Sequence, residues 1–385
     1  MKKKLVAFFL LAGILLIFTV FPTGITAFAA ELDNSLGENV LEQIDALDLK
    51  ALEEYIQSLT GDDLNLAERI LEYIKGEPLD YGNFFSQLFQ VIFRRLQDLL
   101  PSFACILGIC RLSGILTSLK SGESIAPSVR FIGFAGALIP TVVIITECYT
   151  ATKGCIDGIQ TQMNLVFPIL LTLTTACGGS VTAAVCTPSV AFLSTAIVTL
   201  MSSVVLPITL TVICFSLAEG LSDELKLNKF ADFFTSLNKW LIGLCVSVFS
   251  LVFTVQGITG ISYDSVTRRA AKYAIGNGIP IVGGFLSGGF DLAVAGSILI
   301  KNSLGTVSIF LLLGVLFEPL VLLICTNVLF KLTAAITAPL GEKRISDFLS
   351  NTAKHLNYCS AAAIFTAFMY FLCVLILVCS AETFL

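Results

Sequence analysis

The chain has 385 residues and a formal net charge of -5, with 56% hydrophobic and only 13% charged residues. A soluble domain carries about 25% charged residues, so this composition excludes a soluble globular protein and indicates that lipid surrounds most of the chain. Fourteen acidic and three basic residues fall within 31–80, which confines the acidic character to one short region.

The N-terminus has the three parts of a secretory signal peptide. Lys2, Lys3 and Lys4 precede an apolar run from residue 5 to residue 21, and Ala27-Phe28-Ala29 forms an A-x-A site. The pattern predicts a signal peptide over residues 1–29, cleaved after about Ala29. An uncleaved anchor helix is the alternative, and both place the following segment outside the cytoplasm.

Residues 30–83 are predicted to form an acidic extracytoplasmic helical segment. Leu41, Ile44 and Leu47, then Leu52 and Ile56, recur at helical spacing, which predicts two short amphipathic helices. A docking surface for a partner and a solvated linker both fit this pattern. Residues 84–98 are predicted to be an interfacial amphipathic helix with aromatic and basic faces.

The rest of the chain predicts an all-α polytopic membrane protein with seven or eight transmembrane helices. The first membrane spans fall within 99–153. Pro207 and Pro319 sit within two stretches longer than the roughly 20 residues that a span needs, and each predicts a kinked or broken helix. The predicted spans are 99–119, 131–151, 164–186, 188–218, 239–258, 279–300, 304–330 and 357–380.

The membrane part contains a near-repeat at an offset of about 112 residues. The repeat predicts two membrane units, residues 154–262 and 263–385. Three spans in each unit, an odd number, imply an inverted internal repeat of the kind found in many transporters. The matching pieces are Val166-Phe167-Pro168-Ile169 with Gly278-Ile279-Pro280-Ile281, Leu206-Pro207-Ile208 with Glu318-Pro319-Leu320, and residues 229–241 with 344–356.

The basic residues between spans predict the orientation. Counting eight spans, the loops with Lys120 and Arg130, with Arg268 and Arg269, and with Lys343 fall in the cytoplasm. The segment 226–239 then falls outside.

Clusters of glycine and proline mark candidate helix breaks in both repeats. Glycine costs a helix about 1 kcal/mol relative to alanine, so the clusters indicate either close helix packing or an unwound segment that lines a path. The positions are Pro168, Gly178, Gly179 and Pro207 in the first repeat, and Pro280, Gly283, Gly284, Gly288, Gly289 and Pro319 in the second.

Few charged residues lie within the predicted spans, and each needs a partner or water. Asp291 and Glu318 are candidates for a proton or cation path, with Lys301 ten residues after Asp291. The alternative is that these acids cap broken helices or pair with Lys301 or Arg111.

No enzyme motif, metal site or cofactor site is predicted. The chain has one His and twelve Cys without a CxxC pair, and the cysteines fit small apolar residues of membrane helices. An intramembrane aspartyl protease needs a second membrane aspartate beside Asp291, and Asp157 falls in a predicted polar loop. We expect no enzyme activity, no cofactor and no nucleic-acid partner.

One group of residues carries a family resemblance. The run Lys272-Tyr273-Ala274, Ile279-Pro280-Ile281-Val282-Gly283-Gly284, Ser287, Asp291 and Lys301-Asn302-Ser303-Leu304-Gly305 resembles the stage III sporulation protein AE family. The signal peptide, the acidic segment and the multi-span body are similar to that family as well.

The resemblance implies a place in endospore formation. It implies a multi-pass protein of the mother-cell membrane around the forespore, with residues 30–83 in the intermembrane space. The implied partners are the lipid bilayer and the other stage III A membrane proteins, including a cytoplasmic ATPase and ring-forming components, and indirectly the forespore stage II protein Q. The implied function is a part of the channel or secretion-like complex that sustains late forespore gene expression. A secondary transporter for a small solute or ion, and a non-conducting scaffold of the same complex, remain open.

Overall fold

The computed structural model describes residues 43–44, 47, 49–60, 81–119, 126–177, 179–221, 227–278, 283–340 and 343–379. The predicted signal peptide, residues 1–29, lies outside these ranges, as do two of the candidate site residues, Gly178 and Pro280. The described part is helical throughout, with no strand in it, which confirms the all-α prediction.

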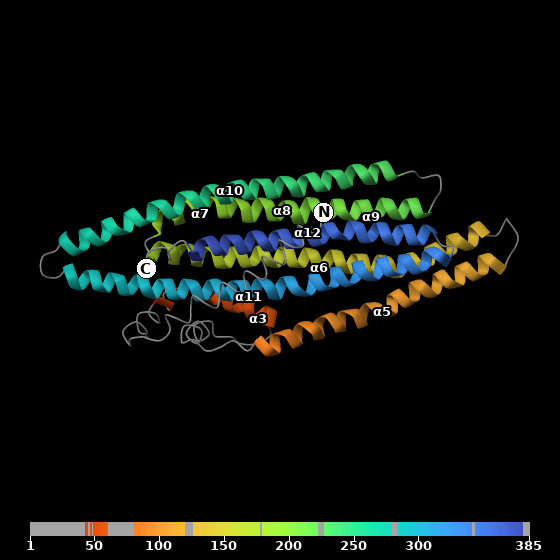
Figure 1. Cartoon of the computed structure of the whole chain (residues 1–385), viewed down its shortest axis with the longest axis horizontal. Coiled ribbons are helices and arrows are strands. Elements are labelled where there is room, and N and C mark those ends of the chain that lie inside the picture. The colour runs from red at the N-terminus through yellow and green to blue at the C-terminus, as the bar shows by residue number, and fades with distance from the viewer. Residues whose placement is uncertain are drawn as a thin grey trace.

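The helices form an elongated bundle in which successive long helices run in opposite directions (Figure 1). α7 to α9 and α10 make one edge, α5 makes the other, and α6, α11 and α12 lie between them. The end of α10 and the start of α11 extend beyond the other helices. The bounds are α3 Lys50–Thr60, α5 Tyr81–Leu119, α6 Ala126–Ala176, α7 Ser180–Phe192, the π-helix η2 Leu193–Ile197, α8 Val198–Leu200, the π-helix η3 Met201–Val205, α9 Leu206–Leu221, α10 Asn228–Gly278, α11 Gly283–Thr337, the 3-10 turn η4 Ala338–Leu340 and α12 Lys343–Cys379.

Six helices in the described ranges are long and apolar enough to cross a membrane, so the protein is polytopic as predicted. They are Gln90–Leu116, Phe131–Ala176, Thr195–Leu221, Lys229–Val255, Val294–Thr337 and Lys343–Cys379. The count differs from the predicted seven or eight because two predicted pairs of spans are continuous helices. α6 runs through 131–151 and 164–186 as far as Ala176, and α11 runs through 283–300 and 304–330. The predicted interfacial helix 84–98 likewise continues into the first span as α5.

The polar residues that suggested loops are compatible with unbroken helices. Lys153 and Asp157 lie on the exposed face of α6, while Lys301 is fully buried on α11. The two predicted gaps between spans are residues 152–163 and 301–303. Neither contains a proline or two adjacent glycines, so the backbone has no reason to leave the helix there. α6 has 51 residues and α11 has 55. At 1.5 Å per residue these helices are about 75–85 Å long, well beyond the roughly 30 Å hydrocarbon core, so part of each extends past it.

The change in span count alters the relation between the repeats. Pro207 lies in α9 and Pro319 in α11, and these helices run in the same direction because only α10 separates them (Figure 1). The inverted relation, which depended on three spans per repeat, is therefore not confirmed. The arrangement of the basic segments also differs from the predicted orientation. Lys229, near the start of α10, shares an end of the bundle with Lys343 at the start of α12, and Arg268, near the end of α10, lies towards the opposite end.

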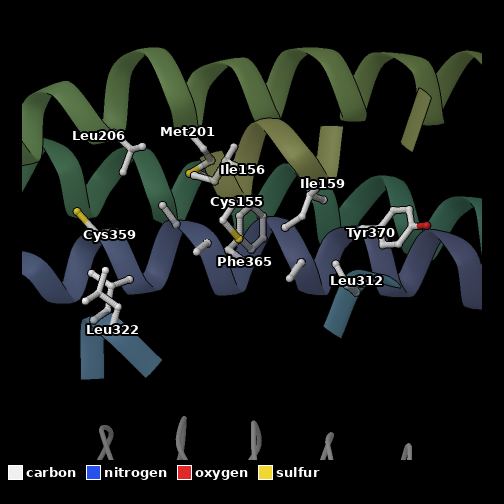
Figure 2. Packing of buried hydrophobic residues seen from close by; sticks show 14 of the residues in the cluster. Cys155, Ile156, Ile159, Met201, Leu206, Leu312, Leu322, Cys359, Phe365 and Tyr370 are labelled. Atoms are coloured by element: carbon white, nitrogen blue, oxygen red, sulfur yellow. The ribbon is translucent and has the colours of Figure 1, made fainter. Parts of the chain in front are cut away.

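The core centres on α12, which packs against α6, α9 and α11 (Figure 2). Its buried face combines small residues with large ones, including Ala362, Ala363 and Tyr370, each at most 1% exposed. Aromatic pairs add to the packing: the Phe167 and Tyr370 rings lie 5.5 Å apart, and those of Phe103 and Phe330 5.2 Å apart. Together these contacts fill the centre of the described bundle with side chains.

Small residues let α11 and α12 come close together. A Cβ atom placed at Gly305 would lie 2.4 Å from a methyl carbon of Val378, nearer than real side chains approach. Asn327 on α11 adds polar ties, because its amide donates to the Ala353 carbonyl and, at 3.1 Å, to the Asn357 side chain. Interhelical hydrogen bonds of this kind contribute about 0.6 kcal/mol each in lipid.

We predict that Gly305→Leu destabilises the protein by about 1–3 kcal/mol, because Val378 cannot move without displacing α12. Gly314→Leu on the same helix is the matched control, since no atom lies within 4 Å of its added Cβ. Thermal unfolding in detergent measures both variants. Equal melting temperatures for the two variants would contradict the close approach at Gly305.

Candidate functional site

A cluster of three charged side chains joins three helices. Arg95 of α5 forms an ion pair with Glu318 of α11, and its second terminal nitrogen lies 3.6 Å from Glu147 of α6. The Arg95 side chain is 27% exposed, while those of Glu147 and Glu318 are 46% and 59% exposed. One guanidinium thus serves two carboxylates, leaving a net charge of -1 on the flank of an apolar bundle.

Each helix reaches the cluster by a different route. Arg95 lies in the predicted interfacial segment, which continues into the first span as the single helix α5. This continuity holds Arg95 in a fixed position relative to the span. α11 presents Glu318 immediately before Pro319, which lies inside the helix rather than at an end. A guanidinium matches a carboxylate in shape and stays ionised in every environment, so the pairing with Arg95 offsets much of the cost of an acid in lipid.

Sequence reasoning named Glu318 but not its partner. The predicted partners were Lys301 and Arg111, whereas the structure pairs Glu318 with Arg95, 223 positions earlier in the chain. Lys301 lies on α11 several turns from Glu318 and is fully buried. No local spacing joins Arg95 to Glu318, so only the packing of α5 against α11 reveals the pair.

The predicted helix break near Pro207 is a pair of π-helices. η2 and η3 interrupt the run from α7 to α9, and α9 begins at Leu206, one residue before Pro207. Proline lacks an N–H and collides with the carbonyl four residues earlier, and the wider π turn accommodates this. π-helices are rare and occur frequently at functional sites.

An acid faces the second π-helix. The Ser202 hydroxyl in η3 donates a hydrogen bond of 3.1 Å to the Asp157 carboxylate on α6. Asp157 was predicted to lie in a polar loop; instead it lies within a continuous helix. The bond ties the irregular turn of one helix to the regular backbone of another.

The other predicted site residues do not gather at one point. Gly283, Gly284, Gly288, Gly289 and Asp291 lie in the first turns of α11, which are helical rather than unwound. Gly179 lies between α6 and α7, where its N–H donates to the Thr174 carbonyl at 2.9 Å and its carbonyl accepts from the Ala183 N–H at 2.9 Å. Pro168 lies inside α6 without breaking it.

The acidic N-terminal segment attaches to the bundle. We name the described residues within 43–60 the strap. Its apolar residues Ile44, Leu49, Leu52 and Ile56 are at most 6% exposed and belong to the same core cluster as α6 and α12. The predicted apolar stripe is thus covered by the chain's own helices. The Tyr55 hydroxyl donates a hydrogen bond of 3.1 Å to the Gly158 carbonyl of α6.

The structure offers no grouping of metal ligands within its described residues. None of the twelve cysteines forms a disulfide, and nine of them are buried. The Cys148 thiol lies 3.5 Å from the Thr326 hydroxyl, a contact between α6 and α11. These cysteines therefore pack as small apolar residues.

The fold and the charged cluster define a class of protein: a multi-pass helical membrane protein with acids and an arginine paired between its helices. The model of the stage III sporulation protein AE family matches residues 64–381, which include all six membrane-crossing helices. The chain belongs to this family.

A curated relative agrees with the family match. The stage III sporulation protein AE of Bacillus subtilis is 25% identical over 244 residues, which cover 63% of this chain and 61% of the relative. The chain thus spans about three fifths of that relative's length. No solved structure matches.

We predict that Arg95 and Glu318 are energetically coupled. Arg95→Gln and Glu318→Gln should each destabilise the protein, and the double variant should lose about 1 kcal/mol less than the two losses combined. Unfolding in detergent measures the cycle. Lys239→Gln, at an exposed position of α10, is the control for removing a positive charge. Additive losses would contradict the pairing.

We predict that the strap detaches at high pH. Burial raises the pKa of Tyr55 above its ordinary value of 10.0, because the attached state favours the neutral phenol. That stabilisation is complete below pH 10 and disappears as the pH rises through the higher pKa of the attached state. A spin label at the exposed Ser58 position, with the exposed cysteines replaced, should gain mobility only above pH 10. In Tyr55→Phe this alkaline step should be absent, and its persistence would assign the step to another group.

Proposed function

We propose that this protein is a membrane component of the mother-cell-to-forespore complex that sustains late forespore gene expression during endospore formation. Membership of the stage III sporulation protein AE family carries the proposal, because the family match includes the six membrane-crossing helices of the described ranges. The proposed location is the mother-cell membrane around the forespore, with residues 30–83 in the intermembrane space.

The filled centre of the bundle favours a shared conduit over a self-contained permease. α12 occupies the middle, and its residues there, such as Leu356, Ala363 and Met369, are almost completely buried. A solute path through the described bundle would have to displace these side chains. The protein would therefore contribute a wall to a conduit formed with other components, and the partially exposed cluster of Arg95, Glu147 and Glu318 would face that contact or path.

The proposed partners are the other stage III A membrane proteins, including the cytoplasmic ATPase and the ring-forming components. Contact with the forespore stage II protein Q would be indirect. A non-conducting scaffold is the second candidate, favoured by the same filled centre. A secondary transporter is less well supported because α9 and α11, which carry the matching residues Pro207 and Pro319, run in the same direction, whereas inverted repeats are the common plan of such transporters.

The first test is a clean deletion of the gene in its spore-forming host, complemented by variants and read with a fluorescent reporter of late forespore transcription. We expect the reporter to stay dark in the deletion strain while earlier forespore genes are expressed normally. Normal late expression in that strain would contradict the proposal.

Two charge-neutral variants then separate conduction from scaffolding. If acids act in a path, Asp291→Asn or Glu318→Gln should abolish reporter expression at a normal protein level and with normal assembly. Asp347→Asn, at an exposed position of α12, is the matched control and should complement fully. Full complementation by all three variants would favour the scaffold.

A further inference from the structure

Polar side chains of the strap, α6 and α12 lie near one another inside an otherwise apolar core. Gln162 of α6 and Tyr370 of α12 are both completely buried. Gln162 lies beside Tyr55 of the strap, and Tyr370 lies within electrostatic range of the same tyrosine. Figure 2 shows Tyr370 at the end of a row of apolar side chains, with its hydroxyl pointing away from Ile159.

The protein uses little of the hydrogen-bonding capacity of these groups. The Tyr55 hydroxyl donates a hydrogen bond to the Gly158 carbonyl. The hydroxyl of Ser308, which lies beside Tyr370, donates one to the Leu304 carbonyl at 2.6 Å. Among the described residues, neither the two amide atoms of Gln162 nor the Tyr370 hydroxyl has a partner at hydrogen-bonding geometry. Buried polar groups are nearly always satisfied by protein or by bound water, because leaving them unsatisfied is costly.

The chemistry of the groups defines the ligand that fits them. An amide, two phenols and the oxygen of a neighbouring carbonyl are neutral donors and acceptors, so a small uncharged hydrogen-bonding molecule matches them without bringing an uncompensated charge into the core. Water is the smallest such molecule, and it needs two to four polar partners in a buried position.

The strap is the element that separates this site from its surroundings. It is held by its four buried apolar residues and by hydrogen bonds that include those from Tyr55 to Gly158 and from Ser297 to Gln43 at 2.8 Å. Its contact with α6 is incompletely filled, because a groove of about 370 Å³ lies between Leu47, Ala51 and Leu52 and the α6 segment 164–172. A single short helix with an incompletely filled contact opens more readily than the long helices of the bundle beneath it.

We propose that Gln162, Tyr370 and Tyr55 form a binding site for water and small uncharged hydrogen-bonding solutes, and that the strap controls access to it. The site belongs to a single chain, so it stands independently of the sporulation complex. Its tests use the purified full-length protein, and their failure would leave the proposed function untouched.

A native thiol reports on access to the site. Cys155 of α6 is buried and lies within electrostatic range of Tyr55. A thiol reacts with maleimide as the thiolate, which forms only where water reaches it. The reporter protein keeps Cys155 alone, with the other cysteines replaced by alanine. A second protein keeps only Cys359, which is buried on α12 and serves as the reference for the bundle itself.

The principal variant detaches the strap. Leu52→Asp places a charge on its buried face and should accelerate labelling of Cys155 by N-ethylmaleimide roughly tenfold or more. Gln57→Asp, on the exposed face of the same helix, is the matched control and should label at the wild-type rate. Cys359 should remain unreactive in both variants. An unchanged rate for Cys155 in Leu52→Asp would overturn the proposal.

Leu52→Asp could also loosen the bundle, in which case Cys359 would become reactive as well. A second variant then tests the polar site without detaching the strap. Gln162→Leu removes the amide and leaves the strap intact, so the site becomes drier and Cys155 should label several-fold more slowly than in the wild-type protein. An unchanged rate in Gln162→Leu would show that no polar site feeds Cys155, and would also overturn the proposal.

Discussion

The close approach of α11 to α12 is the constraint on which the rest of the bundle depends. Lipid tails are as apolar as leucine, so apolar helices gain no hydrophobic energy by pairing and need close van der Waals contact and polar ties instead. Gly305 permits that contact with Val378, and Asn327 ties α11 to Ala353 and Asn357. With α12 held there, α6 and α9 pack on its remaining faces.

Charge then fixes the outer helices relative to this centre. Arg95 holds α5 to both α6 and α11 through Glu147 and Glu318, and a shift of α5 by one turn would leave all three charges unpaired. The hydrogen bond from Ser202 to Asp157 likewise fixes the π-helix η3 relative to α6. These polar contacts join α5, α6, α11 and the π-helix η3 to one another.

The strap links the acidic N-terminal segment to the membrane part. Its apolar stripe covers parts of α6 and α11, two helices that are longer than the hydrocarbon core requires. Tyr55 brings a polar group to the same contact, beside the buried amide of Gln162. The strap therefore covers apolar surface and places a polar group over the core at the same time.

Sequence alone determined the helical class, the membrane environment and the family, because composition and a local motif suffice for each. It also located the disturbance near Pro207 and the amphipathic face of the strap, since both are local properties of the backbone and of side-chain spacing. Only the tertiary structure decided the number of spans, the common direction of α9 and α11 and the pairing of Arg95 with Glu318. Lys153, Asp157 and Lys301 fall between the predicted spans because a charged side chain is costly in lipid. In the structure Lys153 and Asp157 lie on the exposed face of α6, and Lys301 is buried among neighbouring helices. Those outcomes depend on contacts between residues far apart in the chain, which no local pattern contains.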